Sequence, residues 1–165
     1  MTHASRPLAF APLAAAAFLL GACGSAAYQT RPLPSQEVEV SRPDLARIYV
    51  VREGQIRGKL WGLRVEDSDE DIGALDQGDY LCWERAPGRT LLTIVFEGPP
   101  LEGGEREALF SLDAEAGHAY YLVIHIDRRA ESVELQARSG QPDIELVSAD
   151  AGRALVHERR PVPVR

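Results

Sequence analysis

The sequence predicts an all-β fold: a single antiparallel β-sandwich of about seven to nine strands, followed by a short C-terminal helix. Short segments in which apolar residues occupy every second position recur from Ala46 onwards, and a period of two is typical of strands. Glycine and proline pairs such as Pro87-Gly88 separate these segments at intervals of roughly ten residues. The sequence shows no long stretch with a 3.6-residue period, which favours sheets over a helical bundle.

The expected strands are, in chain order, residues 46–52, 63–66, 72–75, 79–83, 90–96, 108–112, 119–126, 133–137 and 144–146. The longest has apolar residues on one face that we expect to line the core: Tyr120, Leu122, Ile124 and Ile126. A second set, Leu92, Ile94 and Phe96, is expected to oppose or neighbour that face. Residues 148–156 are the expected helix, although Gly152 inside it lowers helix propensity.

The N-terminus carries a processing signal. The apolar run from Leu8 to Leu20 is too short to cross a bilayer, which needs about 20 residues. It leads directly into Leu20-Gly21-Ala22-Cys23, which resembles the lipobox of bacterial lipoproteins. The resemblance implies a diacylglyceryl group on the sulfur of Cys23, cleavage just before it, and palmitate-type acyl chains as the membrane anchor. Residues 1–22 are then the signal peptide. An uncleaved membrane anchor is the competing interpretation.

The rest of the chain divides into three parts. Residues 23–45 contain three prolines among polar residues and predict a lipid-anchored, semi-extended tether. Residues 46–157 form the β-sandwich domain, and the basic, proline-bearing residues 158–165 are expected to be a disordered tail. Once Cys23 is lipidated, Cys82 has no intramolecular disulfide partner. The formal net charge of −7, with no basic stripe, argues against binding to nucleic acid or anionic lipid headgroups.

Several short segments occur in a characteristic order: Ala46–Arg52, Ile72–Leu75, Gly78–Tyr80, Pro87-Gly88 and Ala116–Leu122. Together they resemble a family of small bacterial lipoproteins that carry a β-sandwich domain of unknown function. The resemblance implies the fold and the location, and it carries no activity. Gly24 rather than Asp follows the lipidated cysteine, and the similarity to the sorting rule of Gram-negative lipoproteins implies the outer membrane, with the domain facing the periplasm. The Pro87-Gly88 turn and its strand also resemble surface-anchored β-sandwich modules that act as spacers or adhesion domains.

The acidic run Glu66–Asp71 is the most conspicuous candidate site. As a calcium loop, it would use Asp67, Asp69 and Asp71 as its first three ligands, but Ile72 stands where glycine is required and Gly78 where the bidentate glutamate belongs. A solvated acidic turn between two strands is therefore the favoured interpretation. It predicts that neutralising the three aspartates together leaves the fold intact.

The remaining candidates are histidines, a thiol and aromatic side chains. His118, His125 and His157 show no chelating spacing, so no metal site is expected. Cys82 lies between Leu81 and Trp83, where a small buried hydrophobe is favoured over a nucleophile. Four aromatic residues line a ligand groove or pack against their neighbours: Tyr49, Tyr121, Trp61 and Trp83.

These features predict a lipoprotein attached to the membrane by acyl chains on Cys23, with a non-catalytic domain that binds or spaces in the bacterial envelope. No cofactor, metal or catalytic residue is expected, and the partner would be an envelope protein or polymer that the sequence does not identify. The alternative function is a metal-binding or hydrolytic module that acts on envelope polymers.

Overall fold

The structure is a computed structural model that describes residues 30–53, 62–97, 107–126 and 142–165. It is mostly β and arranged as two sheets, which confirms the predicted all-β sandwich. The expected signal peptide, Cys23, the expected strand at 133–137 and Trp61 lie outside the described residues. No helix in the described ranges is long and apolar enough to cross a membrane.

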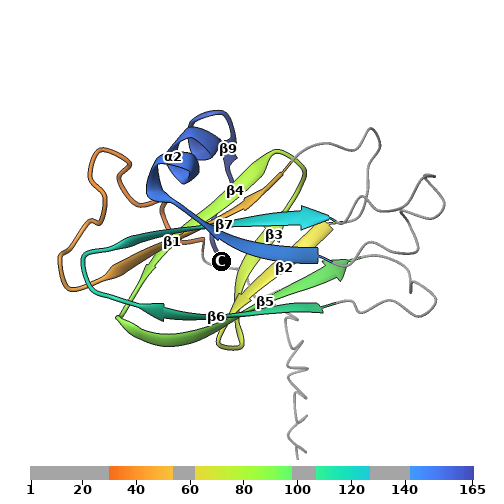
Figure 1. The fold of residues 1–165 in the computed structure, drawn as a ribbon, viewed down its shortest axis with the longest axis horizontal. Coiled ribbons are helices and arrows are strands. Elements are labelled where there is room, and N and C mark those ends of the chain that lie inside the picture. The colour runs from red at the N-terminus through yellow and green to blue at the C-terminus, as the bar shows by residue number, and fades with distance from the viewer. Residues whose placement is uncertain (1–29, 54–61, 98–106, 127–141) are drawn as a thin grey trace, which may run out of the picture.

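Nine strands and one helix are described (Figure 1). They are β1 (Ala46–Arg52), β2 (Gly62–Asp67), β3 (Glu70–Leu75), β4 (Asp79–Arg85), β5 (Gly88–Glu97), β6 (Glu107–Ala114), β7 (Ala119–Ile126), β8 (Pro142–Val147), α2 (Ala149–His157) and β9 (Arg160–Pro161). The five-stranded sheet has the order β8-β7-β1-β4-β9, and the four-stranded sheet has the order β3-β2-β5-β6. The prediction of an antiparallel sandwich is wrong for two pairs of strands. Strand β1 pairs in parallel with β7, and β4 pairs in parallel with β9.

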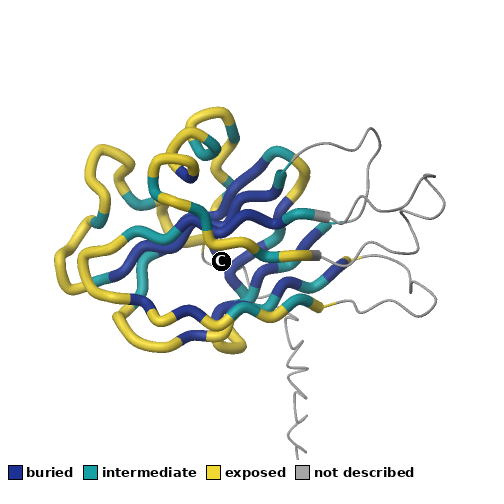
Figure 2. Tube along the Cα trace, viewed as in Figure 1, coloured by how far each residue is buried: buried dark blue, intermediate teal, exposed yellow. Residues whose placement is uncertain are grey.

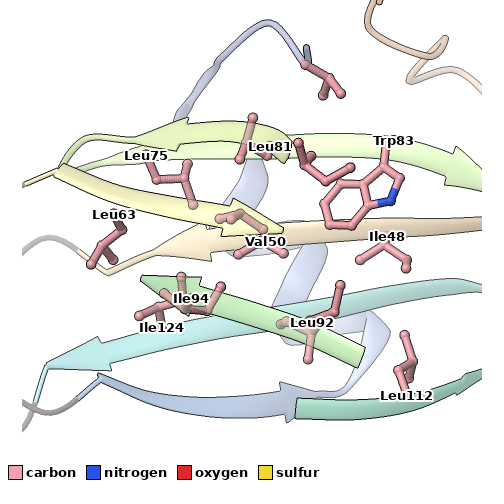
Figure 3. Packing of buried hydrophobic residues seen from close by; sticks show 14 of the residues in the cluster. Ile48, Val50, Leu63, Leu75, Leu81, Trp83, Leu92, Ile94, Leu112 and Ile124 are labelled. Carbon is pink, nitrogen blue, oxygen red and sulfur yellow. The ribbon is translucent and has the colours of Figure 1, made fainter. Parts of the chain in front are cut away.

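The core lies between the two sheets, where alternate residues of facing strands meet (Figures 2 and 3). Leu122 and Ile124 of β7 and Leu92 and Ile94 of β5 are all buried in this cluster, as the alternation predicts. Phe96 belongs to the same cluster. Removing each such aliphatic side chain from water contributes about 1.5–3 kcal/mol, so burial in this cluster stabilises the packing of the two sheets against each other.

The outer face of the five-stranded sheet is also buried. Its cluster consists of Tyr49, Val51, Tyr80, Cys82 and Tyr121. The rings of Tyr49 and Tyr121 stack with centroids 4.6 Å apart and planes 6° apart. Residues Leu155 and Val156 of α2 pack against this cluster, so the helix covers part of the face. Strand β1 is therefore buried on both sides, which explains why all seven of its residues are buried.

Helix α2 forms where it was expected, with the Ser148 hydroxyl accepting a hydrogen bond from the Ala151 N–H as an N-cap. Gly152, which counted against the prediction, lies directly over Tyr121. A Cβ atom at this position would come within 2.1 Å of the Tyr121 ring. The glycine is therefore explained by the close approach of helix and sheet rather than by flexibility.

The prediction of a disordered tail at 158–165 is wrong. Residues Arg160–Pro161 form β9 beside β4, and Val164 is only 2% exposed in the core. Pro161 and Pro163 have no N–H to donate, whereas the intervening Val162 N–H donates to the Tyr80 carbonyl at 2.9 Å. The proline content predicts disorder. However, Val162 and Val164 pack against the core at alternate positions, so the segment is extended and covers one side of the sandwich.

The tether also differs from the expectation over its described part. The Arg31 N–H donates to the Val164 carbonyl at 2.7 Å, so the chain joins the domain well before Ala46. The Arg47 guanidinium donates to the Ser35 and Val38 carbonyls, each at 2.8 Å. These bonds hold residues 31–45 against the domain, and an extended tether is a prediction only for residues that precede them.

Candidate functional site

The acidic run forms a tight hairpin between β2 and β3. Ser68 and Asp69 are its two central residues, and both have positive φ angles, of 50° and 70°. Two left-handed residues in a two-residue loop are the mark of a type I′ turn, which matches the twist of paired strands. The turn places Asp67 and Glu70 opposite each other, and it does not wrap around a central point as a calcium loop does.

Asp67 is the centre of a buried polar network, so the expectation of a solvated turn is wrong for this residue. Its side chain is 6% exposed. One carboxylate oxygen accepts a hydrogen bond from the Trp83 indole N–H at 2.9 Å. The other accepts hydrogen bonds from the Arg85 guanidinium and the Thr90 hydroxyl. Its oxygens are thus occupied by donors from β4 and β5, which makes Asp67 a structural residue.

Other carboxylates of the run pair with arginines from distant parts of the chain. Glu70 forms an ion pair with Arg31, and Asp71 accepts a hydrogen bond from Arg165 at 2.6 Å. Both pairs are partly exposed, so each contributes little on its own. They nevertheless join the hairpin to the N-terminal segment and to the C-terminal segment. The run of acids in sequence becomes a set of attachment points in the fold.

A buried arginine organises the opposite side of the domain. Arg47 is fully buried, and two of its nitrogens donate to the Glu84 carboxylate at 2.7 and 3.0 Å. Burial alone would raise the pKa of Glu84, but hydrogen bonds from the Ser41 N–H and from Arg47 hold that pKa below its ordinary value. A buried ion pair with its remaining donors satisfied is tolerated, whereas either group alone is costly. Arg47 therefore fastens the N-terminal segment to the sheet.

Cys82 is buried under this segment, as expected for a small hydrophobe. Burial raises the pKa of its thiol to about 11, although the nearby Arg47 charge acts in the opposite direction. The thiol is therefore protonated at neutral pH, whereas a nucleophile needs the thiolate.

The structure does not bring the histidines together. His118 directly precedes β7 and His125 lies near the other end of that strand, roughly 20 Å away at strand spacing. His157 is the last residue of α2. The two ring nitrogens of His125 lie 2.9 Å from a Glu53 carboxylate oxygen and 3.2 Å from one of Glu145. The two carboxylates thus lie on opposite sides of the ring. The imidazole connects Glu53, which directly follows β1, with Glu145 of β8. Over the described ranges, no group of three or more His, Cys, Asp or Glu side chains is arranged to hold a metal ion.

The described aromatic candidates pack against neighbours. Trp83 belongs to the core between the sheets, and Tyr49 and Tyr121 form the stack beneath α2 and the N-terminal segment. The groove interpretation is therefore wrong for these three residues. Trp61 lies outside the described residues.

The four-stranded sheet also has an exposed apolar edge that no sequence pattern indicated. Leu109 of β6 is 62% exposed, and Leu91 of the neighbouring β5 is 45% exposed. Strand β6 forms the edge of the four-stranded sheet, where it pairs with β5 on one side. The alternation of β6 indicated which residues face the core, but it could not show that the strand lies at an edge, because edge position is set by long-range pairing.

Comparison with known proteins adds no assignment: no protein-family model matches the chain, and no curated protein matches it. The resemblance to β-sandwich lipoproteins therefore stays a prediction.

Proposed function

We propose that this chain is a lipid-anchored protein of the bacterial envelope. Its β-sandwich domain binds a partner or acts as a spacer, and it does not catalyse a reaction. One observation carries the proposal: side chains that suggested chemistry are occupied in the fold itself. Asp67 accepts three hydrogen bonds, His125 bridges two glutamates, and the Cys82 thiol is buried with a raised pKa. Groups used in this way position strands, whereas catalysis needs groups that can reach a substrate.

The anchor rests on the lipobox-like Leu20-Gly21-Ala22-Cys23. Diacylglyceryl supplies two acyl chains, and stable membrane attachment requires more than one. Gly24 after the cysteine supports an outer-membrane destination with the domain facing the periplasm.

The position of the N-terminal segment at one end of the domain is compatible with attachment to a membrane. Arg31 pairs with Glu70 beside the β2–β3 hairpin, at the end of the four-stranded sheet opposite Glu97. The C-terminal ends of β1, β5 and β7 lie together at that far end (Figure 1). The described chain thus begins near one end of the sandwich, and a membrane anchor that precedes Arg31 would reach the domain from that end.

Metabolic labelling with radioactive palmitate tests the anchor. The variant Cys23→Ser should incorporate no label and should retain residues 1–22, because the acceptor sulfur is gone. Cys82→Ser is the matched control, since it removes the other thiol, and it should be labelled and processed like the wild type. Equal labelling of the Cys23→Ser variant would contradict the proposal.

The metal content of the purified full chain tests the second half of the proposal. After dialysis without chelator, elemental analysis should find far less than one equivalent of any transition metal or Ca²⁺. A stoichiometric metal that is lost from His125→Ala or Asp71→Asn would favour the alternative of a metal-binding module on envelope polymers.

A further inference from the structure

Strand β6 is an outer edge of the four-stranded sheet, with no further strand paired to it within the described residues. Edge strands expose unpaired backbone N–H and C=O groups, and proteins commonly protect them with proline, lysine or a bulge. Residues Glu107–Ala114 contain neither proline nor a basic residue. Their register with β5 is continuous over eight residue pairs, from Val95–Glu107 to Gly88–Ala114, so no bulge interrupts it. The strand is long enough and regular enough to accept another strand.

The opposite side of the sandwich shows how the chain itself closes such a seam. There Val162 donates to the Tyr80 carbonyl of β4, and the Arg165 N–H donates to the Ile72 carbonyl of β3 at 2.9 Å. Val164 fills the space between these strands. Among the described segments, nothing comparable pairs with the outer edge of β6.

Apolar residues occupy the middle of the β6 edge on both of its faces. Leu109 points outward with Leu91 as its diagonal neighbour, since Leu91 pairs with Ser111 and Leu109 with Thr93. Phe110 points inward and is only partly buried against the core. An added strand would cover Leu109 on one face and Phe110 on the other.

One end of this apolar centre is acidic. Glu107 and Asp113 lie toward the two ends of β6, and both are exposed. The exposed Glu97 of β5 is the diagonal neighbour of Glu107, so two carboxylates lie close together at that end. At the other end Arg89 of β5 lies opposite Asp113 and donates to the Ser111 hydroxyl at 3.0 Å, so a positive charge offsets Asp113. A segment that pairs with β6 therefore needs a positive charge at the end that meets Glu107.

We propose that the β6 edge receives an extended segment of a partner protein by strand addition. The segment is apolar in its centre and carries Lys or Arg at the end that meets Glu107. This inference rests on the binding part of the proposed function and names its surface. Charge argues against a second copy of this chain as the occupant. Antiparallel pairing of two β6 strands would bring four carboxylates along one short seam, and like charges across strands are destabilising.

The test uses the full chain purified in detergent micelles and a fluorescein-labelled peptide, Lys-Val-Thr-Val-Thr-Val-Lys. Fluorescence anisotropy should show saturable binding that weakens as salt rises, because part of the attraction is between charges. Two control peptides should bind at least about tenfold more weakly. One carries Glu in place of both Lys residues, and the other carries Pro in place of the central Val, which removes a backbone donor.

Leu109→Glu locates the site, with Leu33→Glu as the matched control. Both leucines are exposed, but Leu33 lies on the N-terminal segment. Leu109→Glu should weaken peptide binding at least about tenfold, and Leu33→Glu should change it by less than about twofold. The proposal is overturned if the peptide does not bind, if the Glu or Pro peptide binds equally well, or if the two variants behave alike. A dimer in sedimentation that Leu109→Glu dissociates would also overturn it, because a second copy would then occupy the edge. None of these outcomes bears on palmitate labelling of Cys23, so the two proposals can fail separately.

Discussion

Asp67 offers the sharpest test of how the acidic hairpin works. Replacing it with alanine removes a nearly buried carboxylate and leaves the Trp83 indole N–H, the Arg85 guanidinium and the Thr90 hydroxyl without their acceptor. Removing one partner of a buried ion pair costs about 3–5 kcal/mol. Asp67→Ala should therefore lower the free energy of unfolding by that amount, a large fraction of the roughly 5–15 kcal/mol of a typical domain.

Two further variants separate the charge from the shape of the residue. Asp67→Asn keeps an acceptor for the indole but loses the ion pair, so a smaller loss of about 1.5–3 kcal/mol is expected. Asp69→Asn is the matched control. Asn adopts the left-handed conformation that Asp69 has in the turn, and the change should stay within about 0.5 kcal/mol.

Urea unfolding followed by tryptophan fluorescence measures all three, since Trp83 contacts Asp67 directly. If Asp67→Ala unfolds at the same urea concentration as Asp69→Asn, the carboxylate has no structural role. The expectation from sequence, that neutralising Asp67, Asp69 and Asp71 spares the fold, would then be correct after all.

Three other predictions follow from the packing. Gly152→Ala should lower the free energy of unfolding by about 1–3 kcal/mol, because the added methyl group would meet the Tyr121 ring. Alanine is otherwise the better helix former by about 1 kcal/mol, so a rise in Tm in thermal unfolding would contradict the close packing of helix and sheet. Leu122→Ala should cost about 2–5 kcal/mol through a core cavity, and His125→Ala, on the partly exposed end of the other face, should cost less; the reverse order in denaturant would refute the face assignment. The raised pKa of Cys82 favours the folded state while the thiol is protonated. The stability difference between wild type and Cys82→Ala should therefore be constant below pH 9 and shrink towards about pH 11, and a difference that grows with pH would contradict the burial argument.

The features that could be predicted from sequence are those set by local periodicity. Alternation in residues 90–96 and 119–126 placed Leu92, Ile94, Leu122 and Ile124 in the core, because the period-two pattern reflects the two faces of a sheet directly. The helix after Ser148 was also expected, and its N-cap agrees with that expectation.

The features that could not be predicted depend on contacts between distant residues. The sequence near Val164 is short, basic and rich in proline, and only the space between β3 and β4 makes it a buried strand-like segment. The acidic hairpin raised the same difficulty: the partners of Asp67 lie 16 to 23 residues away, on strands whose order in the sheets no local pattern reveals. The composition of both regions predicts exposure to solvent, whereas contacts with distant strands bury Asp67 and Val164.

The most direct test of the central claim is intact mass spectrometry of the mature protein extracted from membranes. A lipid-anchored protein predicts a chain that begins at Cys23 and carries a diacylglyceryl group on that sulfur. A chain that begins at another residue, or one with an unmodified Cys23, would contradict the account.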